Sequence, residues 1–155
     1  MVRASLMRLL GVQEVGTLVA SAACGADIIA LEAASALSVR TCIVLPFDSP
    51  RFRLTSVIDR GEAWGPRFDA VMRAAELRHD VTVLPPEAGD DEAAYGQATA
   101  RIIADSLALA EHDGTRAIAI AIWDGVARED ADATRDFITR ALAADMEVIS
   151  ISTLG

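Results

Sequence analysis

The residues best suited to chemistry lie at a joint of small residues, between a short apolar run and a stretch with helical periodicity. This joint reads Ser21-Ala-Ala-Cys24-Gly25-Ala26-Asp27. Small side chains let a ligand approach the backbone N–H groups at a helix N-terminus, which carries about half a positive charge. The alternative is a tight strand-to-helix turn, in which Gly25 takes a positive φ and Asp27 stabilises the first helical turn. The sequence leaves both interpretations open.

Three side chains near predicted element ends could take part in catalysis, and each has a structural alternative. Cys24 precedes a helix, which favours a thiolate, but no histidine lies near it in sequence to act as base, so packing is the favoured interpretation. Glu32 either faces a pocket or is a solvated helix residue. Asp124 follows a strand, where its carboxylate either holds a ribose hydroxyl or closes a turn with Gly125.

Aromatic residues and arginines gather after the second predicted strand. These aromatic side chains either stack on a nucleobase or pack over the hydrophobic core beneath a loop, and the sequence favours the packing role. The six arginines between 51 and 78 alternate with acidic residues and predict a mixed solvated face, from which Arg51 or Arg67 could reach an anion. The four aromatic residues are Phe47, Phe52, Trp64 and Phe68.

Composition excludes several kinds of site. All 14 basic residues are arginine, so chemistry that needs a lysine amine is excluded. The two cysteines are too few for a disulfide framework, and the cysteines and histidines lack the spacing of a zinc site, so we expect no metal and no cofactor. The histidines are His79 and His112, and each precedes an aspartate at a predicted element end. The net charge of -9 opposes binding to nucleic acid or to an anionic membrane. We expect a cytoplasmic protein, since no apolar run reaches the roughly 18 residues of a membrane span.

The elements that must position these residues alternate between strand and helix. Apolar runs of strand length alternate with stretches of helical period, which is typical of an α/β protein with a parallel sheet. The predicted strands are 17–21, 40–45, 80–84, 117–123 and 147–151. The predicted helices are 2–10, 26–37, 67–77, 91–111 and 131–144, with a shorter one at 51–58 inside an irregular segment, 46–66.

Two of these elements allow finer predictions. Strand 117–123 is apolar on both faces, so we expect it to be central in the sheet. Helix 91–111 should lie on one face of the sheet, with Arg101, Asp105 and Glu111 turned away. Its apolar stripe consists of Ala98, Ile102, Ile103, Leu107 and Ala110.

Several short motifs together carry a resemblance to a known superfamily. Over roughly residues 17 to 151 the chain resembles the Rossmann-like SLOG superfamily, typified by DNA-processing protein A and the lonely-guy phosphoribohydrolases. The resemblance is greatest to bacterial members with CGAD, LPF, WGxRF and WDG motifs. Here these motifs are Cys24-Gly25-Ala26-Asp27, Leu45-Pro46-Phe47, Trp64-Gly65-Pro66-Arg67-Phe68 and Trp123-Asp124-Gly125.

The length of 155 residues predicts a single domain, residues 1–155, with an N-terminal helix and lead-in at 1–16. The resemblance implies that this domain is a three-layer Rossmann-like domain. It further implies a mainly parallel five-stranded sheet, helices on both of its faces, and a pocket for a nucleotide or nucleotide-derived ligand at the strand carboxyl ends. The ligand-binding residues would be Ser21, Cys24, Gly25, Ala26, Asp27, Phe47, Trp123, Asp124, Gly125 and Thr134.

Departures from the superfamily pattern shape the functional prediction. Relatives usually begin with a further strand, whereas this chain opens into helix 2–10. Asp132-Ala133-Thr134 stands where relatives carry Gly-Gly-Thr, which predicts poor phosphate binding, and the lonely-guy Pro-Gly-Gly-x-Gly-Thr-x-x-Glu motif is absent.

We therefore expect a sensor or binding module without robust catalysis, whose partner is a nucleotide-like small molecule. One alternative is an N-glycosidic-bond hydrolase that acts on nucleoside monophosphates through Glu32 or Asp124. The other is a protein-interaction module with a vestigial pocket, with a homodimer as one arrangement.

Overall fold

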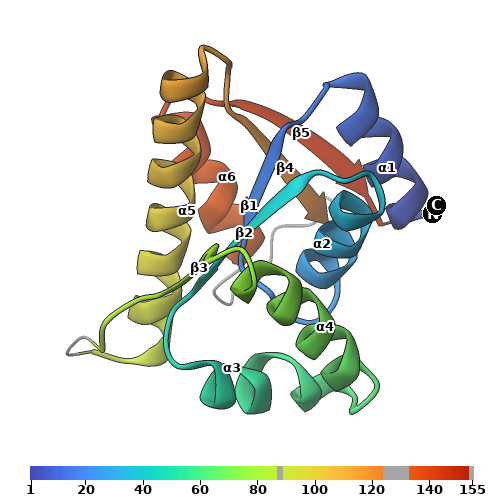
Figure 1. Ribbon diagram of the computed structural model, residues 1–155. Helices are drawn as coiled ribbons and strands as arrows, with labels where there is room; N and C mark the ends of the chain where they lie inside the picture. Colours follow the sequence, from blue (N-terminus) through green and yellow to red (C-terminus); the bar gives the residue numbers. More distant parts are fainter. Residues whose placement is uncertain (87–88, 124–132, 154–155) are drawn as a thin grey trace.

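The computed structural model describes residues 1–86, 89–123 and 133–153, and its elements alternate between helices and parallel strands (Figure 1). It is an α/β protein, as the sequence predicts. The helices are α1 (Val2–Val12), α2 (Ala26–Ala36), α3 (Ser49–Ser56), the short 3-10 helix η1 (Ile58–Arg60), α4 (Trp64–Glu76), α5 (Asp91–Asp113) and α6 (Ala133–Ala143). The strands are β1 (Thr17–Ala20), β2 (Arg40–Leu45), β3 (Val81–Val83), β4 (Ile118–Trp123) and β5 (Glu147–Ser152).

The five strands form two small parallel sheets. The first has the order β1-β2-β3, and the second pairs β4 with β5. The prediction of one five-stranded sheet is therefore wrong, and so is the central place predicted for strand 117–123, because no ladder joins β4 to β1 among the described residues. Side chains join the sheets instead: Leu18 of β1 and Ile120 of β4 pack in one apolar cluster under α1 and α2.

The two faces of β2 pack against different helices. Ile43 and Leu45 face α2 and α4, whereas Val44 on the opposite face packs against Ala98 of α5. The predicted placement of helix 91–111 on one face of the sheet is confirmed, since α5 contacts β1 and β2. In Figure 1, α1, α2 and α4 lie on one side of the strands, and α5 and α6 on the other.

Segment 46–66, predicted to be irregular apart from a short helix at 51–58, is mostly helical, and α3 confirms the short helix with bounds shifted by two residues. It contains α3, η1 and the first turn of α4. Its prolines signal loops in the sequence, but Pro50 and Pro66 lie in the first turns of α3 and α4, where a missing N–H costs no helical hydrogen bond. The carboxylate of Asp48 caps α3 by accepting the N–H of Arg51 at 2.9 Å.

α5, the longest helix, has clear end signals. Its N-terminus is capped by Asp90, which accepts the N–H of Ala93 at 2.9 Å, and it ends at Gly114 in the left-handed conformation. Its stripe departs from the prediction at two positions, because Leu107 is 38% exposed and Asp105 lines a pocket described below. None of the described helices is long and apolar enough to cross a membrane.

Candidate functional site

The joint between β1 and α2 has an open backbone at its glycine. Gly25 has φ +92° and directly precedes α2, and no side chain caps the helix. No atom beyond its chain neighbours lies within 4 Å of the position that a Cβ on Gly25 would occupy. The positive φ predicted for a strand-to-helix turn is therefore present, and the backbone there borders open space.

Asp27 stabilises this joint by turning back toward the strand. Its Oδ2 accepts a hydrogen bond from the N–H of Ala23 at 3.1 Å. Burial raises the pKa of Asp27 to about 6, although that hydrogen bond acts to lower it. The carboxylate thus holds the turn that presents Gly25, and it adds a titratable charge close to the helix N-terminus.

The other side of the joint packs beneath the α3–η1 segment. Ala22 is fully buried in the main core, and the N–H of Cys24 donates to the carbonyl of Ser56 at 2.9 Å. Burial raises the pKa of the Cys24 thiol, and the nearby carboxylate of Asp59 raises it further. The thiol therefore stays protonated near neutral pH, which opposes a role as nucleophile.

Phe47, which follows the carboxyl end of β2, packs in the main hydrophobic core. It is 6% exposed, and its ring centroid lies 5.7 Å from that of Tyr95 in an edge-to-face arrangement. The guanidinium of Arg51 lies 4.1 Å above the Phe47 ring and forms an ion pair with Asp91. The hydroxyl groups of Ser56 and Tyr95 share a hydrogen bond. Tyr95 was not predicted as a neighbour of Phe47, although its position near the start of the helix after β3 could have indicated this contact.

Glu32 links two helices. Both of its carboxylate oxygens accept hydrogen bonds from Arg67 of α4, with a distance of 3.0 Å from Nε to Oε2. Arg67 also lies 4.3 Å above the ring of Trp64. Glu32 is therefore engaged in an ion pair between α2 and α4 that remains partly exposed to solvent.

The remaining predicted residues belong to the β4–α6 connection. Trp123 ends β4 and Thr134 lies in the first turn of α6, and both are partly buried. Asp124, Gly125 and the phosphate-opposing Asp132 lie outside the described residues. The structure thus brings Ser21 to Asp27 together in one joint at the carboxyl end of β1, and it places Trp123 at the carboxyl end of β4.

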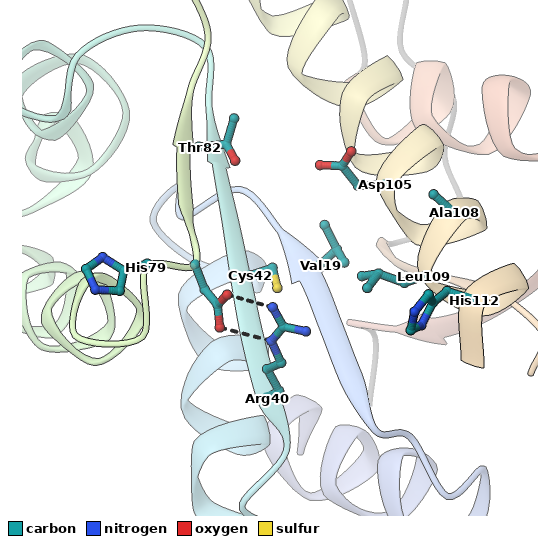
Figure 2. Close-up of a pocket in the computed structure, with 10 residues that line it drawn as sticks. Val19, Arg40, Cys42, His79, Thr82, Asp105, Ala108, Leu109 and His112 are labelled. Carbon is teal, nitrogen blue, oxygen red and sulfur yellow. Dashed lines mark hydrogen bonds and ion pairs between the residues drawn. The ribbon is translucent and has the colours of Figure 1, made fainter.

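A pocket that the sequence analysis missed lies near the amino ends of β2 and β3 (Figure 2). It has a volume of about 410 Å³. Arg40, the first residue of β2, holds Asp80 with two hydrogen bonds of 3.0 and 2.7 Å. The pairing of Arg40 with Asp80 could have been predicted from the sequence, because these oppositely charged residues begin two predicted strands of one parallel sheet. The lining residues are Val19, Arg40, Cys42, His79, Asp80, Thr82, Asp105, Ala108, Leu109 and His112.

The described residues offer no cluster of three or more histidine, cysteine, aspartate or glutamate side chains that could hold a metal ion. Comparisons with models of protein families, with curated proteins and with solved structures gave no match to this chain.

Proposed function

We propose that this protein is a Rossmann-like domain related to the SLOG superfamily that binds a nucleotide or nucleotide-derived ligand at the strand carboxyl ends. The observation that carries the proposal is the open backbone at Gly25, which has φ +92° and precedes the uncapped N-terminus of α2. Backbone N–H groups at such a position bind polar or anionic groups without a side chain. The CGAD and WDG motifs add the superfamily resemblance to this geometry.

Charge near the joint favours a ligand with few phosphates. Asp27 carries a negative charge above its pKa of about 6. In the sequence between β4 and α6, Asp132 stands where relatives of the superfamily have glycine. Both charges oppose a phosphate at a helix N-terminus. The expected ligand is therefore held mainly through its base and ribose.

Binding without robust catalysis agrees with the state of Glu32 and Cys24, the two candidate groups within the described residues. Both oxygens of Glu32 are engaged by Arg67, and the raised pKa of Cys24 keeps its thiol protonated. Neither group is prepared to act as a base or nucleophile at neutral pH.

A thermal-shift panel of nucleosides and nucleotides, followed by calorimetry of the hits, tests the proposal. At least one compound should raise the melting temperature of the wild-type protein, and Gly25→Val should abolish that shift, because a side chain there would fill the open space. Gly114→Val is the matched control: it also places valine at a positive φ, +66°, in open space, and strains the backbone by about 1 to 3 kcal/mol. The control should keep the ligand shift.

Three outcomes contradict the proposal in different ways. If no compound shifts the melting temperature, an interaction module is favoured instead. If Gly25→Val retains full binding, the ligand lies elsewhere. If chromatography detects free base released from a nucleoside monophosphate, the protein is a hydrolase.

A further inference from the structure

The pocket in Figure 2 forms where α5 ceases to cover the sheet closely. Over the carboxyl half of β2, Val44 packs against Ala98 of α5, and Leu84 joins the same cluster. Arg40 and Cys42 lie on the same face of β2 as Val44, because side chains on a strand alternate. Over this amino half, charged residues stand beside the apolar side chains of Val19 and Leu109, and a pocket of about 410 Å³ separates α5 from the strands.

Arg40 forms one end of the pocket and retains a free donor edge. Its Nε and Nη2 donate to the two oxygens of Asp80, whose side chain is only 8% exposed. Among the described residues no hydrogen bond engages Nη1, and Figure 2 shows this third nitrogen pointing away from Asp80, toward the α5 side. Asp80 therefore fixes the guanidinium and directs its remaining edge at the pocket, where it suits a carboxylate.

Asp105 of α5 forms the opposite end. Its Oδ1 accepts from Nε of Arg101 at 2.8 Å, and no hydrogen bond among the described residues engages its Oδ2. In Figure 2 its carboxylate faces the strands, and Val19 and Leu109 lie between it and Arg40. Two further titratable residues stand at the end of α5: His112 lines the pocket with an 87% exposed side chain, and its neighbour Asp113 lies close enough to act electrostatically on Arg40.

We propose that this pocket binds a small zwitterion of the amino-acid or ω-amino-acid class. The ligand carboxylate would pair with Nη1 of Arg40, its ammonium group with Oδ2 of Asp105, and its methylene groups would pack on Val19 and Leu109. A cationic end, an anionic end and an apolar middle complement such a molecule better than they complement a simple anion or a simple cation, each of which leaves one charged end unpaired. This site lies at the opposite strand ends from the proposed nucleotide site.

Calorimetry with glycine, γ-aminobutyrate and ε-aminocaproate tests the proposal, with butyrate and butylamine as single-charge analogues. At least one zwitterion should bind about tenfold more tightly than either analogue, which is the scale of one additional charge-assisted hydrogen bond. The absence of binding by all three zwitterions, or equal affinity for butyrate or butylamine, overturns it.

Asp105→Asn locates the ammonium end. The substitution is isosteric, breaks only an exposed ion pair on one helix, and should weaken zwitterion binding about tenfold. Asp136→Asn is the matched control, since Asp136 forms the same kind of exposed ion pair with Arg140, at 2.9 Å. Equal affinity of the two variants would overturn the assignment.

Alkylation of the two cysteines by iodoacetamide, followed by mass spectrometry, gives a second measure of location. Cys42 lines this pocket, and Cys24 lies in the β1–α2 joint. A bound zwitterion should slow alkylation of Cys42 and leave the rate at Cys24 unchanged. Equal slowing of both thiols, or slowing of Cys24 alone, would contradict binding in this pocket.

Discussion

Asp27 has a role that its position in the first turn of a helix does not by itself reveal. A carboxylate there usually accepts N–H groups of the helix, but Asp27 accepts the N–H of Ala23, which precedes the helix. The turn gains a hydrogen bond, while burial raises the pKa of the carboxyl from 3.8 to about 6. The negative charge of Asp27 at neutral pH is therefore a cost to folding.

Asp27→Asn should remove this cost. The folded chain binds the Asp27 proton more tightly than the unfolded chain, so the free energy of unfolding falls as the pH rises from about 4 to about 6 and keeps the lower value above that window. Asparagine still accepts from Ala23 and carries no charge. Urea unfolding should find the variant more stable than wild type at neutral pH, by on the order of 3 kcal/mol, and similar to it below pH 4. A difference that does not change with pH would contradict this account.

At this scale the positive φ of Gly25 was part of one of the two interpretations that the sequence left open, and the partners of the charged residues were not predicted. Asp27, Glu32 and Arg67 were each assigned by local spacing alone. Their partners depend on tertiary packing: Glu32 and Arg67 are brought together only when α2 lies against α4.

The WGxRF element shows how a motif that suggested function contributes to helix packing. Arg67 binds Glu32 of α2, and Phe68 is 1% exposed in the core. Gly65 allows Arg53 to approach α4, because a Cβ at Gly65 would lie 2.6 Å from Nη2 and 3.2 Å from Cζ of Arg53. Arg53 in turn forms two hydrogen bonds with Asp69 of the same helix. The element therefore holds α3 and α2 against α4.

Gly65→Ala and Gly11→Ala should differ in their effect on stability. Both glycines lie in helices, where alanine is favoured by roughly 0.5 to 1 kcal/mol. Gly11 has no atom near the position of a Cβ, so its substitution should stabilise the protein. At Gly65 the new methyl group crowds Arg53 and Ile58, and Gly65→Ala should be about 1 kcal/mol less favourable. Equal unfolding midpoints in urea for the two variants would contradict the proposed packing.

The elements themselves were largely predictable, and the exception has a physical cause. β2 has its predicted bounds, and α2 and α5 begin at the predicted residues, because apolar periodicity and end signals agree there. In segment 46–66 the short helix predicted at 51–58 is present as α3, but the rest of the segment was expected to be irregular. Proline signals both a loop and the first turn of a helix, and only the packing of Phe52 and Val57 in the core distinguishes the two.

For the whole molecule, the main question is how two sheets form one structure. The apolar cluster under α1 provides the connection, since Leu6 and Leu10 are almost fully buried and pack in the same cluster as Leu18 of β1, Ile120 of β4 and Ile151 of β5. This burial should make the two sheets unfold together.

The two tryptophans can test this cooperativity. Trp64 begins α4, which packs on the first sheet, and Trp123 ends β4 of the second sheet. Trp64→Phe and Trp123→Phe each leave one fluorescent reporter. The two reporters should give the same urea midpoint. Leu6→Ala should lower both midpoints together, at a cost of about 2 to 5 kcal/mol. Separate transitions, or a loss confined to one reporter, would show that the sheets fold independently.

At this scale the sequence predicted parallel strands and an α/β fold but neither the division into two sheets nor the pocket. Periodicity indicates that 117–123 is a strand, whereas its neighbours depend on backbone pairing that periodicity does not encode. The pocket arises because α5 packs closely only over the carboxyl half of the first sheet, which is a tertiary property.

The most direct test of ligand binding at the strand carboxyl ends is the alkylation rate of Cys24 in the presence of nucleosides and nucleotides, with Cys42 as an internal reference. Cys24 directly precedes Gly25 in the β1–α2 joint, whereas Cys42 lines the pocket near the amino ends of the strands. The account predicts that a compound that raises the melting temperature also slows iodoacetamide alkylation of Cys24 and leaves that of Cys42 unchanged. A compound that binds yet leaves the rate at Cys24 unaltered, or that protects Cys42 instead, would contradict it.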